Sequence, residues 1–91
     1  MAKNHYHVTE YPGVQSPRRD PTAFARFEDA QRHAAERAKE IVAAAREKDP
    51  EAGIVGFDPD RFVIDVGSGT RTVIEIVPCV ETSPGCLGEI R

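Results

Sequence analysis

The chain has 91 residues, of which 40% are hydrophobic and 30% are charged, a composition that fits one small globular domain and excludes a disordered chain. The formal net charge of −3 disfavours a nucleic-acid-binding domain, because such domains hold phosphates through an excess of lysine and arginine. The sequence lacks both an apolar run of about 18 residues and the apolar core of a signal peptide, so we expect a cytoplasmic protein without a membrane contact.

The first half of the chain predicts strands before a helix. Residues 4–11 alternate and are rich in β-branched and aromatic side chains, which indicates a strand that ends at Pro12 and Gly13. Residues 22–27 fit either a short strand or a first helical turn with Asp20 as N-cap and Pro21 at the next position. We favour the strand, with Phe27 just before the helix.

A long helix is predicted over residues 28–48. Small and apolar side chains recur there at steps of three and four and form one narrow stripe, made of Ala30, Ala34, Ala38, Ile41, Val42 and Ala45. Pro50 ends the helix, because the residue before a proline disfavours the helical conformation. Alanines contribute little apolar area, so the bulk of the core must come from a sheet.

The second half of the chain predicts one short strand, residues 54–57, and then a hairpin around the sequence GSGT. A two-residue turn would place the apolar residues of its two strands on opposite faces, because a shift of one residue reverses every side chain. We therefore expect a three-residue loop with a glycine bulge, which pairs Ile64 with Ile74 and Phe62 with Ile76. Residues 82–91 fit a weakly structured tail.

These elements predict a single α+β domain over residues 1–91, in which one long helix packs on one face of a three- to four-stranded, mostly antiparallel sheet. The layout resembles that of many small proteins from actinobacterial and phage genomes. That resemblance covers the layout alone and implies an accessory protein or an inhibitor that docks on another protein. It assigns no role to any residue.

One helix covers one face of a sheet, so the other face of the hairpin should be polar. It carries three valines beside two carboxylates: Val63, Asp65, Val73, Glu75 and Val77. The valines either are exposed strand formers or contact a partner protein or a second copy of the chain. Because no nucleophile–base set is visible, the leading hypothesis is a non-enzymatic protein-interaction domain that needs no cofactor. Its partner is another protein or, in a homodimer, a second copy of the chain.

A zinc-stapled module is the third hypothesis. His5 and His7 lie two apart in a strand and share one face, and Cys79 and Cys86 supply two further ligands of the type that zinc prefers. The alternatives are a pair of half-exposed strand histidines and a small loop closed by the two cysteines.

The second hypothesis, which ranks ahead of the zinc module, places an anionic partner on the loop that carries Arg18 and Arg19. Together with the N-terminal strand, these two arginines could contact a nucleic acid, with tyrosines available for stacking. The overall acidic charge makes nucleic acid the less favoured partner.

Overall fold

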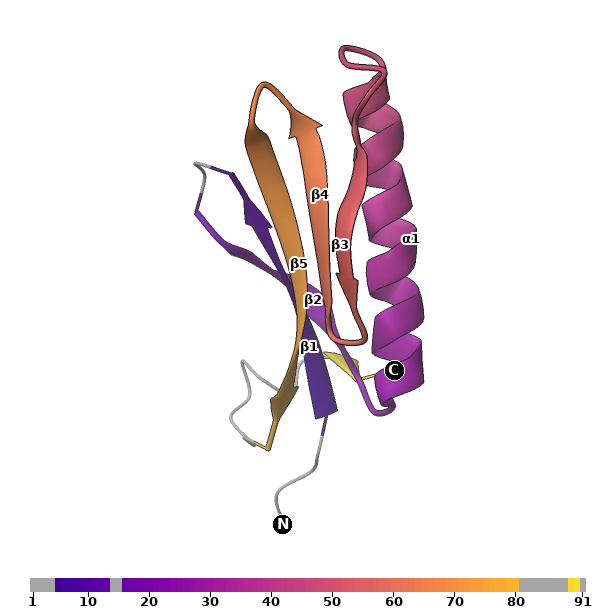
Figure 1. Cartoon of the computed structure of the whole chain (residues 1–91). Coiled ribbons are helices and arrows are strands. Elements are labelled where there is room, and N and C mark those ends of the chain that lie inside the picture. The colour runs from indigo at the N-terminus through magenta and orange to yellow at the C-terminus, as the bar shows by residue number, and fades with distance from the viewer. Residues whose placement is uncertain (1–4, 14–15, 81–88, 91) are drawn as a thin grey trace.

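The computed structural model describes residues 5–13, 16–80 and 89–90. In this part of the chain, one 20-residue helix lies on one face of a six-stranded sheet (Figure 1). In chain order the elements are β1 (His5–Pro12), β2 (Arg18–Phe24), α1 (Phe27–Arg46), β3 (Gly53–Asp58), β4 (Arg61–Gly67), β5 (Thr70–Cys79) and β6 (Glu89–Ile90). The predicted α+β class with a single long helix is confirmed.

The strands follow the order β3-β4-β5-β1-β2-β6 across the sheet. All neighbouring strands are antiparallel except β2 and β6, which run parallel. The sheet exceeds the predicted three to four strands because both short segments, around residues 22–27 and 54–57, pair into it. Residues 89–90, within the predicted weakly structured tail, also pair with Thr22 and Ala23. The rest of that tail lies outside the described residues.

The helix matches its prediction to within two residues at each end. The side chains of Ala30, Ala34 and Ala38 are fully buried against the sheet, which confirms the alanine stripe. Phe27 is the first helical residue instead of preceding the helix. Small side chains let α1 lie close to the sheet, so the alanine face of the helix packs directly on the larger side chains of the sheet.

The segment before the helix is a strand, as favoured from the sequence. Asp20 does not cap α1, because it lies within β2, and the residue before the helix is Arg26. The Asp20 carboxylate instead accepts a hydrogen bond from the Thr22 backbone N–H at 2.8 Å. This local bond satisfies one carboxylate oxygen inside β2 and leaves the other oxygen for the helix.

The predicted register of the hairpin is wrong by two residues. The structure pairs Phe62 with Ile74 and Ile64 with Thr72, around a two-residue turn at Ser68 and Gly69. A bulge between Asp65 and Gly67 adds one residue to β4 and so restores the faces that the tight turn would have reversed. The apolar side chains therefore share one face, as expected, through a different loop.

The two faces of the sheet differ in cover. Phe62, Ile64, Ile74 and Ile76 are buried in the core that includes the helix alanines. The five residues predicted to bind a partner alternate with them, so they lie on the face away from α1, and each is half-buried: Val63, Asp65, Val73, Glu75 and Val77. Their role in binding a partner remains a prediction. No helix in the described part of the chain is long and apolar enough to cross a membrane.

Candidate metal site

Two histidines and a cysteine meet on the face of the sheet away from α1. The β1–β5 ladder places His5 opposite Cys79 and His7 opposite Val77. In β5 these partners alternate with Ile76, which faces the helix, and side chains that pair across two strands share a face. His5, His7 and Cys79 therefore project from the same side of the sheet.

Both histidine side chains are buried. His5 is 1% exposed and His7 is 5% exposed, so the alternative of two half-exposed strand histidines is wrong. The two rings meet edge to face, with centroids 4.7 Å apart and an interplanar angle of 90°. A buried polar ring needs a hydrogen-bond or metal partner, because burial without one costs free energy.

The two imidazoles direct the same ring nitrogen at each other. The Nε2 atoms of His5 and His7 are 3.1 Å apart, a hydrogen-bond distance. One Nε2 must then carry a proton and donate it, while the other accepts. The alternative arrangement protonates both rings at Nδ1 and directs both Nε2 lone pairs at a shared cation.

Cys79 brings a third donor to the same point. One ligand atom from each of His5, His7 and Cys79 lies within 4.8 Å of the other two. Two nitrogens held at about 2.0–2.1 Å by a tetrahedral zinc ion are about 3.3 Å apart, and a nitrogen and a thiolate sulfur are about 3.6 Å apart. The Nε2–Nε2 distance of 3.1 Å is already close to the nitrogen–nitrogen value. The ligand atoms lie within 4.8 Å of one another, so a closing movement of about 1 Å would reach the nitrogen–sulfur value.

The structure thus assembles three of the four zinc ligands proposed from the sequence. Cys86, the fourth, lies outside the described residues. The sequence predicted the histidine pair because residues two apart on a strand project from the same face. Nothing in the sequence shows that β1 pairs with β5, so the approach of Cys79 could be proposed from residue type but not placed.

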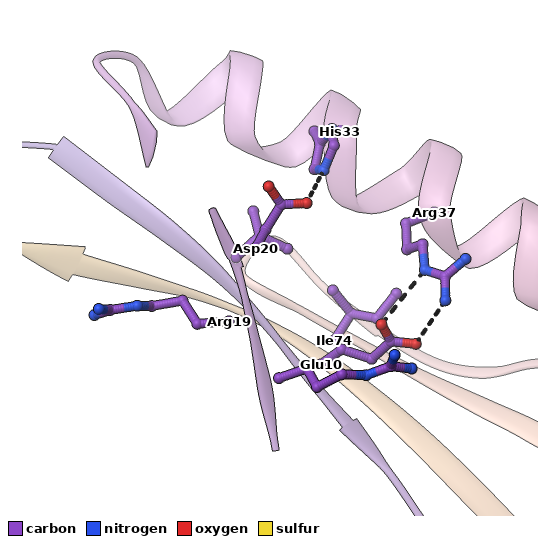
Figure 2. Close-up of a pocket in the computed structure, with 8 residues that line it drawn as sticks. Glu10, Arg19, Asp20, His33, Arg37 and Ile74 are labelled. Atoms are coloured by element: carbon purple, nitrogen blue, oxygen red, sulfur yellow. Dashed lines mark hydrogen bonds and ion pairs between the residues drawn. The ribbon is translucent and has the colours of Figure 1, made fainter. Parts of the chain in front are cut away.

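A second polar cluster lies between the sheet and the helix, where a hollow of about 210 Å³ is lined in part by Arg18 and Arg19. Both arginines are exposed on β2. Figure 2 shows the Arg19 side chain directed away from Arg37 and His33. Binding of an anion by Arg18 and Arg19 remains a prediction.

The same hollow contains an ion pair and a histidine–carboxylate hydrogen bond that the sequence did not predict. Arg37 of α1 donates from Nε and Nη2 to the two carboxylate oxygens of Glu10 in β1, at 3.4 and 3.1 Å. The Nε2 atom of His33 lies 2.7 Å from an oxygen of Asp20 in β2 (Figure 2). These two contacts involve Arg37 and His33, and they tie the helix to two strands.

No protein-family model matches the chain, and comparison with curated proteins and with solved structures found no match either.

Proposed function

We propose that the protein is a small, non-enzymatic domain that binds one zinc ion through His5, His7 and Cys79. The observation that supports this proposal is the convergence of three ligand atoms within 4.8 Å, two of them from buried imidazoles. The donors come from two different strands, β1 and β5, so a shared ion would join these strands at one end of the sheet.

The donor types select the metal. Imidazole nitrogen and thiolate sulfur are the ligands that zinc prefers in proteins, whereas magnesium and calcium prefer oxygen. The cluster offers two nitrogens and one sulfur. A zinc ion is therefore the occupant that matches the chemistry, and cobalt(II), which takes the same geometry, is its spectroscopic substitute.

Burial supports a structural role for the metal. The histidine side chains are 1% and 5% exposed, so an ion between them would have little access to a substrate. A bound metal ion would also add to the stability of a small domain, because the hydrophobic core of such a domain buries little apolar surface. Of the eleven buried hydrophobic residues in the described part of the chain, five are alanines, which bury little apolar area.

A structural zinc site is normally closed by a fourth protein ligand. The sequence offers Cys86 for this position, as proposed from residue type. A Cys86→Ser variant tests that ligand separately from the three donors that the structure brings together. Loss of metal in this variant would identify a closed site with two cysteines, and retention would leave the fourth position to water.

The test is a metal measurement on the purified wild-type protein. After reconstitution with zinc and removal of loosely held ions, elemental analysis should find about one zinc per chain. Titration with cobalt(II) should give visible d–d bands of a tetrahedral site and a charge-transfer band from the Cys79 thiolate. Cys79→Ser should abolish the charge-transfer band, and His7→Ala should lower the zinc content.

His33→Gln is the matched control, because His33 is the third histidine of the chain and pairs with Asp20 far from the cluster in sequence. It should retain full zinc content and an unchanged cobalt spectrum. A wild-type protein that binds neither ion above the level of the Cys79→Ser variant would overturn the proposal. Circular dichroism of every variant confirms that loss of metal does not simply report an unfolded chain.

A further inference from the structure

The β3 strand forms an open edge of the sheet. β3 pairs with β4 on one side, and among the residues that the structure describes no strand pairs with it on the other (Figure 1). An open edge presents backbone N–H and C=O groups that can pair with another strand, and natural proteins protect such edges with lysine, proline or bulges. The β3 sequence, GIVGFD, contains neither lysine nor proline, and its bulge is described below.

The side chains on this edge are apolar and exposed. Ile54 is 45% exposed, Val55 is 55% exposed and Phe57 is 65% exposed. These are three of the five large hydrophobic residues that are exposed in the described part of the chain, and they are close neighbours on one strand. We name this surface the β3 edge and define it by these three residues.

We propose that the β3 edge joins two copies of this chain into a symmetric dimer by antiparallel β3–β3 pairing. A second copy is the occupant that fits, because a two-fold axis between Val55 and Gly56 pairs each strand residue with a residue of the same face. Ile54 of one copy then lies opposite Phe57 of the other. Gly53 likewise lies opposite Asp58.

A bulge in β3 makes this pairing consistent. The ladder to β4 shifts between Ile54 and Gly56, so Val55 is an extra residue in the strand. Ile54 and Phe57 consequently both lie on the face that α1 covers, as shown by their partners Ile64 and Phe62. Without the bulge, residues three apart would lie on opposite faces, and the symmetric pair of Ile54 and Phe57 would not form.

The charges at the two ends of β3 complement each other under the same symmetry. Arg46 donates from Nε to the Ala52 carbonyl at 2.8 Å, and its Nη2 atom lies 3.7 Å from the position that a Cβ atom would take at Gly53. Asp58 lies at the opposite end of the strand. Pairing Gly53 with the second copy's Asp58 places that carboxylate beside Arg46, twice per dimer.

Neither Arg46 nor Asp58 forms an ion pair within residues 5–13, 16–80 and 89–90, and the Arg46 guanidinium donates its hydrogen bond to a backbone carbonyl. A groove of about 310 Å³ next to the edge, lined by Val42, Ala43 and Ile54 among others, receives the facing Phe57 ring on the helix side. The dimer thus buries the exposed apolar residues and forms two ion pairs.

The test is the mass of the wild-type protein in solution, measured by light scattering during size exclusion at several concentrations, with and without zinc. We expect twice the monomer mass of 10.0 kDa. Val55→Lys should give a monomer, because it places a desolvated charge on the paired edge. Val80→Lys is the matched control, since Val80 is 60% exposed but lies after β5, and it should remain a dimer.

Charge reversal tests the symmetry itself. Asp58→Arg and Arg46→Glu should each give monomers, because each places like charges together at both ends of the pair. An equimolar mixture of the two variants should recover the dimer mass, because every facing pair then has opposite charges. A wild-type protein that stays a monomer at all concentrations, or a mixture that fails to associate while both variants are folded, would overturn the proposal.

Discussion

His5 lies directly opposite Cys79 in the β1–β5 ladder, on the face of the sheet that α1 does not cover. The two residues are separated by most of the chain, so their contact closes a loop that contains β2, the helix, β3 and β4. Any bond between them constrains the unfolded chain strongly, because the entropy lost on closing a loop grows with its length. A metal shared by these strands would therefore act on the stability of the whole domain.

Zinc should raise the melting temperature of the wild-type protein. A ligand at about one hundred times its dissociation constant stabilises the folded state by about 2.7 kcal/mol. For a domain of this size, each kcal/mol raises the melting temperature by roughly 4–8 °C, so differential scanning fluorimetry should show an increase of roughly 10–20 °C. A chelator should reverse it.

The specificity of this shift is tested by two variants. Cys79→Ser should lose most of the zinc-dependent increase in melting temperature, whereas His33→Gln should keep it, because of these two residues only Cys79 belongs to the cluster. An equal increase in both variants would mean that zinc binds elsewhere on the chain.

The ion pair between Arg37 and Glu10 should couple the helix to β1. Its Glu10 side chain is only 15% exposed, and Arg37 contacts both carboxylate oxygens, so we expect a coupling energy of about 1 kcal/mol, at the upper end for partly exposed pairs. A double-mutant cycle with Arg37→Met and Glu10→Gln, followed by urea unfolding, measures it. The exposed pair of Arg32 and Asp29 is the comparison and should give about 0.3 kcal/mol. Equal coupling in the two cycles would contradict the expected effect of burial.

The sequence predicted the elements of this fold better than their neighbours in space. The spacing of Ala30, Ala34 and Ala38 defined the helix and its buried side, because a helical period is a local property. The hairpin faces were also correct, since alternation fixes them. Its register was wrong, because a bulge next to Gly67 adds a residue that leaves no mark on the apolar pattern.

The candidate site shows the same division between local and long-range information. The shared face of His5 and His7 follows from their spacing, so the sequence could propose a pair of ligands. The meeting of that pair with Cys79, and of Glu10 with Arg37, depends on which strands and helices pack together. Such contacts between distant residues are set by the tertiary fold and have no periodic signal.

Replacing the central alanine of the helix stripe should destabilise the domain. Ala34 is fully buried among the core residues, so the larger side chain of Ala34→Leu has no space and should cost about 1–3 kcal/mol by overpacking. Ala44→Leu is the control, because Ala44 is exposed on the same helix and both residues favour helices. Urea denaturation should show a clear decrease in the midpoint for Ala34→Leu alone. A similar midpoint for both variants would mean that the helix lies farther from the sheet than described.

A substitution at Ser68, in the turn of the β4–β5 hairpin, should stabilise the protein. Ser68 has a φ of 55° and Gly69 a φ of 74°, the positive values found at both central residues of a type I′ turn. Asparagine tolerates this conformation better than serine, so Ser68→Asn should stabilise the protein by about 0.5 kcal/mol, measured as an increase of about 0.3–0.5 M in the urea midpoint.

A substitution at Gly67, in the same hairpin, should instead destabilise the protein. Its φ is 101°, and a Cβ atom there would lie 2.8 Å from a carboxylate oxygen of Asp49, so Gly67→Ala should cost more than about 1 kcal/mol. At Gly69 no atom lies within 4 Å of the added Cβ, so Gly69→Ala carries only the cost of its positive φ and should be the milder change. If Gly67→Ala proved the milder of the two, β4 would have to leave the sheet by a different path from the bulge that sets the register of the hairpin.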